Sequence, residues 1–105
     1  MKFAFINKSA EHEYNDLPQS VKNTFQLDFT ALKAGSKPFS KIESLNTVGK
    51  GSFELKINGS PAYRCVYVAK YNDTVYILHS FIKTTNGVDR QAIKTASSRY
   101  KLIPK

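Results

Sequence analysis

Two runs of strand-forming residues, 63–70 and 75–83, constrain the fold of this chain more than any other feature. Both runs are rich in Val, Ile, Tyr and Phe, and only the polar segment Tyr71-Asn72-Asp73-Thr74 separates them. β-branched and aromatic runs this close together predict an antiparallel hairpin. The fold must therefore contain a sheet built around this hairpin.

The register of the hairpin follows from its turn. A two-residue loop at 72–73, or a four-residue loop over 71–74, places Arg64 opposite Phe81 and Val66 opposite His79. Because side chains alternate between the faces of a strand, Arg64, His79, Phe81 and Lys83 then share one face. A loop of three or five residues would reverse this parity.

That face carries cations, a titratable ring and an aromatic surface, the groups that suit a phosphodiester and its neighbouring base. The same residues are equally compatible with an ordinary solvated sheet face, with His79 hydrogen-bonded at the edge of the core. The opposite side of the hairpin is expected to face the helix-covered core, with the residues Tyr63, Tyr67, Leu78 and Ile82.

The charge of the chain favours a polyanionic partner. The 105 residues carry a formal net charge of +8, and residues 53–105 hold 9 basic and 3 acidic side chains, whereas residues 1–52 hold 7 and 5. The excess of +6 thus lies in the half that contains the hairpin, and nucleic acid is the commonest soluble polyanion. Solubility alone, or attraction to an acidic protein, would produce the same imbalance.

Cysteine usage and the first residues bear on the cellular setting. A single cysteine, Cys65, excludes an internal disulfide and a cysteine-built zinc site, and its apolar strand predicts a small buried residue on the face opposite Arg64. No spacing typical of metal ligands occurs, and His12 in its acidic neighbourhood predicts surface decoration. The apolar run at 3–6 is too short for a signal peptide or a membrane span, so we expect a cytoplasmic protein without membrane, metal or cofactor.

The remaining chain predicts a small α+β domain spanning residues 1–105. We expect a strand at 3–6, a brief helix at 9–14 and a longer helix at 18–34, whose apolar stripe is Val21, Phe25, Phe29 and Leu32. Residues 35–52 read as a long connection, and the alternation at 53–57 predicts a third strand beside the hairpin. A terminal helix is expected over 89–102, capped by Asp89. The prediction is a three-stranded antiparallel meander plus an N-terminal strand, with helices on one face and an open, shallow, basic face on the other.

The sequence resembles the RelE/ParE toxin superfamily, specifically its HigB-like, phage-derived branch, over about residues 17–103. The segments that carry the resemblance are Leu17-Pro18, Tyr63-Arg64, Tyr67-Val68, Val75 to Lys83 and Ala96 to Arg99. The resemblance implies a compact sheet flanked by helices and a helix-turn-helix, HigA-like antitoxin as partner. It implies cleavage of messenger RNA in the ribosome, although ParE relatives poison DNA gyrase instead. The family commonly has a second lysine after Lys83, where this chain has Thr84.

The chemistry implied is RNA transesterification without a metal ion. Arg64 is the candidate clamp for the transition state, Lys83 a second electrostatic stabiliser, and His79 the proton carrier. Phe81 would stack on a base, and the Thr84 hydroxyl would hydrogen-bond a phosphate. The expected electrostatic footprint for RNA or the ribosome is Lys70, Arg90, Lys94, Arg99 and Lys101. A gyrase inhibitor of the same fold and a basic binding module without catalysis remain as alternatives.

Overall fold

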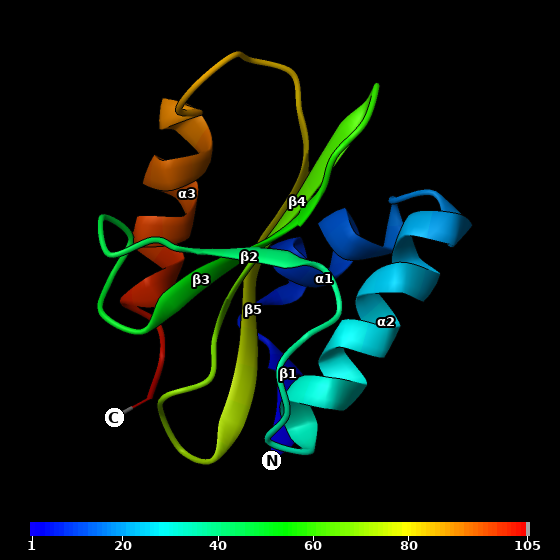
Figure 1. Cartoon of the computed structure of the whole chain (residues 1–105). Coiled ribbons are helices and arrows are strands. Elements are labelled where there is room, and N and C mark those ends of the chain that lie inside the picture. Colours follow the sequence, from blue (N-terminus) through cyan, green and yellow to red (C-terminus); the bar gives the residue numbers. More distant parts are fainter. Residues whose placement is uncertain (105) are drawn as a thin grey trace.

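The predicted hairpin stands at the centre of a five-stranded sheet with three helices (Figure 1). The computed structural model describes residues 1–104. In chain order its elements are β1 (Lys2–Phe5), α1 (Lys8–Asn15), α2 (Gln19–Lys33), β2 (Lys41–Ser44), β3 (Ser52–Ile57), β4 (Ala62–Val68), β5 (Thr74–Lys83) and α3 (Arg90–Tyr100). The expected α+β class is confirmed.

The sheet has the strand order β1-β5-β4-β3-β2 and is mixed, because β1 runs parallel to β5 while the other pairs are antiparallel. The expected three-stranded meander is one strand short, since β2 forms within the stretch 35–52 that we expected to be a connection. β2 is exposed along its whole length and contains a single apolar residue, Ile42, so no alternation signals it. Its backbone pairing with β3 makes it an edge strand.

A buried carboxylate holds the chain that leads into β2. Asp28 on α2 is fully buried and accepts hydrogen bonds from the backbone N–H groups of Phe39 (2.8 Å) and Ser40 (2.9 Å). The Ser40 hydroxyl donates a third bond at 2.6 Å. Three donors compensate the carboxylate for its lost hydration, so Asp28 ties the segment before β2 to the helix.

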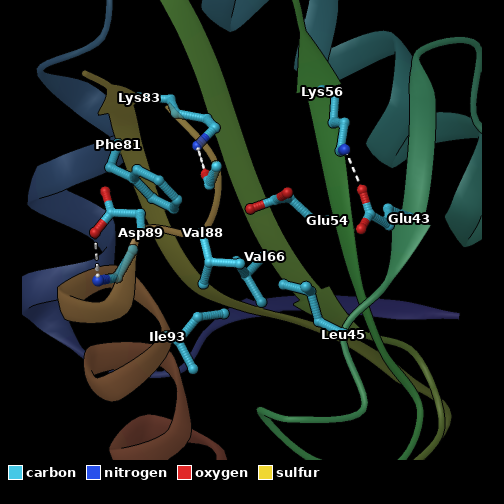
Figure 2. Close-up of a pocket in the computed structure, with 12 residues that line it drawn as sticks. Glu43, Leu45, Glu54, Lys56, Val66, Phe81, Lys83, Val88, Asp89 and Ile93 are labelled. Atoms are coloured by element: carbon cyan, nitrogen blue, oxygen red, sulfur yellow. Dashed lines mark hydrogen bonds and ion pairs between the residues drawn. The ribbon is translucent and has the colours of Figure 1, made fainter. Parts of the chain in front are cut away.

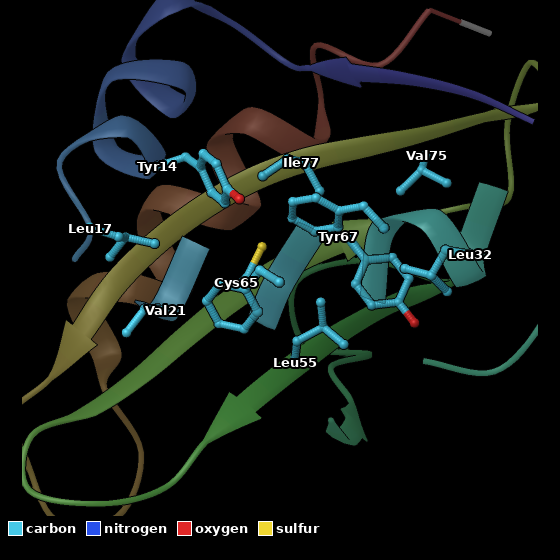
Figure 3. Packing of buried hydrophobic residues seen from close by; sticks show 11 residues of the cluster. Tyr14, Leu17, Val21, Leu32, Leu55, Cys65, Tyr67, Val75 and Ile77 are labelled. Atoms are coloured by element: carbon cyan, nitrogen blue, oxygen red, sulfur yellow. The ribbon is translucent and has the colours of Figure 1, made fainter. Parts of the chain in front are cut away.

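Each face of the sheet has its own hydrophobic core. α1 and α2 cover one core, which contains Cys65 and Ile77 (Figure 3). Phe25 and Phe29 of α2 belong to the same cluster. α3 covers the other face, where Ala96 packs with residues of β4 and β5 (Figure 1). The expectation that the helices share one face is therefore wrong. An apolar stripe predicts that a helix packs on a sheet, but it contains no information about which face it covers.

The helices themselves follow the sequence pattern. All four members of the predicted stripe of α2 are buried: Val21, Phe25, Phe29 and Leu32. We expected Pro18 at the first helical position of α2. It instead lies at the N-cap, one position earlier. Asp89 caps α3 as predicted, with its carboxylate accepting from the Ala92 N–H at 3.0 Å. Within residues 1–104 no helix combines the length and apolar character needed to cross a bilayer.

The predicted register of the hairpin is confirmed in the part far from the turn, where the candidate site residues lie. Arg64 pairs with Phe81, and Val66 pairs with His79. Arg64, Phe81 and His79 therefore share a face, as expected from the parity of the turn. Lys83, two residues beyond Phe81 on β5, belongs to the same face.

A β-bulge changes the register on the other side of this point. The pairing shifts between Val66 and Tyr67, and Tyr67 pairs with Ile77, so that Leu78 is the extra residue of β5. Leu78 consequently packs in the core under α3, and its expected place beside Tyr67 is wrong. Ile82, also expected in the core, is 48% exposed near the end of the ribbon. Tyr67 is buried on the α2 side as predicted.

Cys65 behaves as the sequence predicts. It is fully buried in the core under α2, on the face opposite Arg64. Burial raises the pKa of its thiol to about 12, because the thiolate would lose its hydration there. A thiol with so high a pKa is a packing residue and not a nucleophile.

Candidate functional site

A pocket of about 370 Å³ lies on the sheet face that carries α3 (Figure 2). Strands β2 to β5 form its floor, and the segment 84–89 with the start of α3 forms its wall. Its charged lining side chains include Glu43, Glu54, Lys56 and Lys83. The expected open, shallow and basic face is therefore wrong, because α3 returns across it and the lining alternates in sign.

Lys83 lies at the rim of this pocket at the end of β5. Its ammonium group donates to the carbonyl oxygen of Thr85 at 3.1 Å and to that of Gly87, which holds the segment after β5 in a bend. Phe81 lines the pocket beside it. The aromatic ring of Phe81 stacks on the imidazole of His79, with ring centroids 4.7 Å apart. One strand thus presents an ammonium, an aromatic ring and an imidazole in succession.

Arg64 is buried beneath this face and does not line the pocket. It is 6% exposed, and its guanidinium donates to the carbonyl oxygens of Tyr63 (3.0 Å) and Ile57 (3.3 Å) and to Asn58 Oδ1 (3.1 Å). Its Nε is buried without a hydrogen-bond partner, 3.7 Å from a Glu54 carboxylate oxygen. The guanidinium is therefore a fixed positive charge at the turn between β3 and β4.

His79 belongs to a cluster that connects three elements. Its Nδ1 lies 2.8 Å from Glu13 Oε1 of α1, and Arg99 of α3 donates to both oxygens of that carboxylate at 2.8 and 2.9 Å. Arg99 also donates to the Leu78 carbonyl oxygen at 2.9 Å. The Arg99 and His79 side chains are each 13% exposed. We call Glu13, His79 and Arg99 the ionic cluster.

The ionic cluster exists because β1 is shorter than β5. β1 ends at Phe5, opposite Ile77, and α1 then lies along the part of β5 that β1 leaves uncovered. The Glu13 carboxylate there also faces the Ser80 N–H, at 3.5 Å. Burial alone would raise the pKa of Glu13, but hydrogen bonds from Arg99 and His79 and their charges outweigh it and hold the pKa below its ordinary value.

Glu13 is the functional candidate that the sequence did not indicate. Glu13 and Arg99 are 86 positions apart in the sequence, and no sequence pattern pairs the two side chains. The available signal is local and weak: Glu13 adjoins Tyr14, which is buried in the core, so α1 must pack against the sheet close to that carboxylate. Arg99, expected in the electrostatic footprint, is instead half-buried in this cluster.

The other expected RNA-binding residues lie outside the pocket. Arg90, Lys94 and Lys101 are exposed on or just after α3, and Thr84 is exposed after Lys83. Lys70 lies beyond the far end of β4, with its ammonium 5.4 Å from the centre of the Tyr71 ring. The structure therefore distributes these groups over two ends of the hairpin. Their contribution to RNA binding stays a prediction.

The described part of the chain contains no cluster of side chains typical of a metal site. Over residues 1–104, no three side chains of His, Cys, Asp or Glu gather closely enough to hold a metal ion. His12 is exposed on α1.

A family model described as "Phage derived protein Gp49-like (DUF891)" matches residues 12–101. The chain belongs to this family. The Gp49-like proteins are a toxin family of the RelE/HigB type, in line with the resemblance of the sequence. The matched residues of this Gp49-like chain run from α1 to the end of α3 and include the ionic cluster, Arg64 and Lys83. No curated protein is similar enough to this chain to count as a match.

Proposed function

We propose that this Gp49-like protein is the toxin of a type II toxin–antitoxin system and a ribosome-dependent endoribonuclease. The observation that carries the proposal is the arrangement on β5, where His79, Phe81 and Lys83 follow one another on a single face and Glu13 holds the imidazole. A helix-turn-helix antitoxin of the HigA type would be its partner. Messenger RNA in the ribosome would be its substrate.

The proposed reaction is an internal transesterification of RNA. The ribose 2′-hydroxyl oxygen bonds to the adjacent phosphorus, the bond from phosphorus to the 5′ oxygen breaks, and the products are a 2′,3′-cyclic phosphate and a 5′-hydroxyl end. One proton leaves the 2′-hydroxyl and one must reach the 5′ oxygen, so a proton carrier lowers the barrier. DNA lacks the 2′-hydroxyl and would not react.

His79 is the proton carrier in this proposal. A carboxylate beside Nδ1 favours the tautomer with hydrogen on that nitrogen, leaving Nε2 for proton transfer. Nε2 makes no hydrogen bond with residues 1–104, and the buried polar atoms without partners there are Ser52 Oγ and Arg64 Nε. Nε2 is therefore accessible to substrate or solvent. Arg99 keeps the Glu13 carboxylate in place by gripping both of its oxygens.

The two cations have different parts in the proposed mechanism. Lys83 lies at the pocket rim and would contact the phosphate as negative charge builds on it, exchanging its loop carbonyl partners for phosphate oxygens. Arg64 would act as a fixed charge beneath the face, because its terminal nitrogens already have protein partners. Phe81 would offer an aromatic surface to a neighbouring base.

Mapping of transcript ends after a short induction pulse tests the proposal directly. We expect internal breaks in translated messages, with 5′-hydroxyl and 2′,3′-cyclic phosphate ends, before growth stops. Intact transcripts together with DNA damage signalling would instead indicate a gyrase inhibitor. Absence of any growth effect would favour a binding module without catalysis.

Substitutions on β5 connect the activity to the site. Lys83→Gln keeps an amide that can donate to the loop carbonyls but removes the charge, and we expect cleavage to fall by about 100-fold or more. His79→Ala should reduce cleavage by about 100-fold through loss of proton transfer. The matched control is Lys37→Gln, which removes one exposed charge from the segment before β2. Full cleavage by a folded Lys83→Gln variant would remove the proposed site.

A further inference from the structure

Glu54 is the unusual group in the pocket. It projects from β3 into the space between Lys83 and Glu43 (Figure 2), with a side chain that is 13% exposed. Its carboxylate accepts no hydrogen bond from residues 1–104, and its nearest cation is Arg64 Nε at 3.7 Å. The oxygens are absent from the set of buried unpaired atoms, so they are open to the pocket.

The neighbouring charges do not neutralise Glu54 fully. Lys56 is engaged by Glu43, and Lys83 by carbonyl oxygens of the loop. Burial raises the pKa of Glu54 above its ordinary value, against the opposing charges of Arg64 and Lys56. A half-buried carboxylate with vacant acceptor positions is suited to a ligand that brings N–H donors.

Apolar side chains also line the pocket around this carboxylate. Val66 and Phe81 line the pocket from the sheet, while Val88 and Ile93 line it from the segment before α3 and from α3 itself. The volume of about 370 Å³ falls at the lower end of the ~300–1,000 Å³ typical of small-ligand sites. These dimensions suit one flat ring system, with apolar contact on its faces and hydrogen bonds at its edge.

We propose that the pocket is a base-specificity subsite that binds guanine, with Glu54 reading its Watson–Crick edge. This inference rests on the proposed function and names the base that the substrate RNA presents. Only guanine, among the four RNA bases, presents two adjacent donors, N1–H and the 2-amino group, which match the two oxygens of one carboxylate. Adenine and cytosine each place a ring acceptor beside their amino group, and uracil flanks its N–H with two carbonyls.

The same chemistry orients the nucleotide. A phosphate would be repelled by Glu54, so the base enters the pocket and the phosphate stays at the rim, where Lys83 lies. Phe81 belongs to both regions, since it lines the pocket and stacks on His79. The scissile phosphate would therefore lie next to the recognised base.

Nucleotide titration followed by NMR of the backbone amides tests the subsite without requiring cleavage. Guanosine 5′-monophosphate should shift the amides of Val66, Phe81, Val88 and Ile93, and should bind about 5- to 150-fold more tightly than inosine or adenosine 5′-monophosphate. Inosine keeps N1–H and lacks only the 2-amino group. Equal affinity for the three nucleotides, or shifts confined to other residues, would overturn the assignment and leave the pocket to a protein partner.

The substitution Glu54→Gln separates base reading from charge. An amide presents one acceptor and one donor, which leaves the guanine 2-amino group without an acceptor and matches the amino group and N1 of adenine, so the preference for guanosine over inosine and adenosine monophosphate should be lost. If the variant changes binding only through the lost charge, it should bind all three nucleotides more tightly and to the same degree. That result would refute recognition of the guanine edge by Glu54. The matched control Glu11→Gln removes an exposed carboxylate on α1, outside the pocket, and it should keep the guanine preference.

Cleavage assays distinguish the two proposals from each other. In the first outcome, the wild-type protein cuts RNA, and replacing guanine by inosine at any position near the break does not change the cleavage. This outcome would refute the subsite but not the nuclease. RNA that is never cut, together with guanine-selective binding in the titration, would refute the nuclease and retain the subsite as a nucleotide site.

Discussion

Removal of the Glu13 carboxylate tests whether the ionic cluster holds the fold and the site together. Glu13→Ala deletes the acceptor of four hydrogen bonds, two from Arg99 and one each from His79 and the Ser80 N–H, and leaves the Arg99 charge half-buried without its partner. Breaking a fully buried pair in this way costs about 3–5 kcal/mol. Because the Glu13 side chain is 29% exposed, water replaces part of the loss, and we expect the free energy of unfolding to fall by about 2 kcal/mol.

Urea denaturation at neutral pH measures this change, and a fall of that size lowers the thermal midpoint by roughly 8–16 °C. Glu11→Gln is the matched control, since it alters an exposed carboxylate on the same helix and should cost only a few tenths of a kcal/mol. A loss below about 0.5 kcal/mol for a folded Glu13→Ala variant would show that the cluster contributes no more than a surface ion pair.

The pH dependence of the same measurement has a definite sign. The pKa of Glu13 is lowered in the folded protein, so the unfolded chain binds the proton more readily between the two values. The stabilisation is therefore present above the ordinary carboxyl pKa and is lost as the pH falls through the folded value. Glu13→Gln should flatten the stability curve in that acidic range. An unchanged slope in the variant would contradict the lowered pKa.

Two further predictions concern buried groups outside the site. Asp28→Ala removes the acceptor of all three bonds and leaves two backbone N–H groups and a hydroxyl without it, so unfolding should become about 2–3 kcal/mol easier, as measured by urea denaturation. A variant as stable as wild type would show that the tether is dispensable. Cys65, with a thiol pKa of about 12, should react with a thiol reagent at pH 8 only as fast as the protein unfolds, and rapid modification of the native protein would contradict its burial.

The sequence predicted those parts of the fold that depend on local pattern. The register that pairs Arg64 with Phe81 follows from residue alternation and the length of the turn, and the buried stripe of α2 follows from its helical period. The bulge that moves Leu78 to the other core has no such pattern, because a single inserted residue leaves the β-forming composition unchanged. β2 could not be predicted because an exposed edge strand has no buried face, and its sequence therefore lacks the alternation of apolar and polar residues.

The candidate site divides in the same way. Arg64, His79 and Lys83 could be grouped because they belong to one hairpin, and their proposed roles stay predictions. The pairing of His79 with Glu13 could not be foreseen, since it depends on α1 occupying the edge of β5 that the short β1 leaves uncovered. Glu54 could be assigned to a strand, but its position in a pocket depends on α3 covering that face.

The two hydrogen bonds between Arg99 and Glu13 join α3 to α1, far apart in the sequence. During synthesis the histidine on β5 would emerge from the ribosome well before the residue that fixes its carboxylate partner. The proposed reactive geometry would thus be complete only after α3 has also left the ribosome.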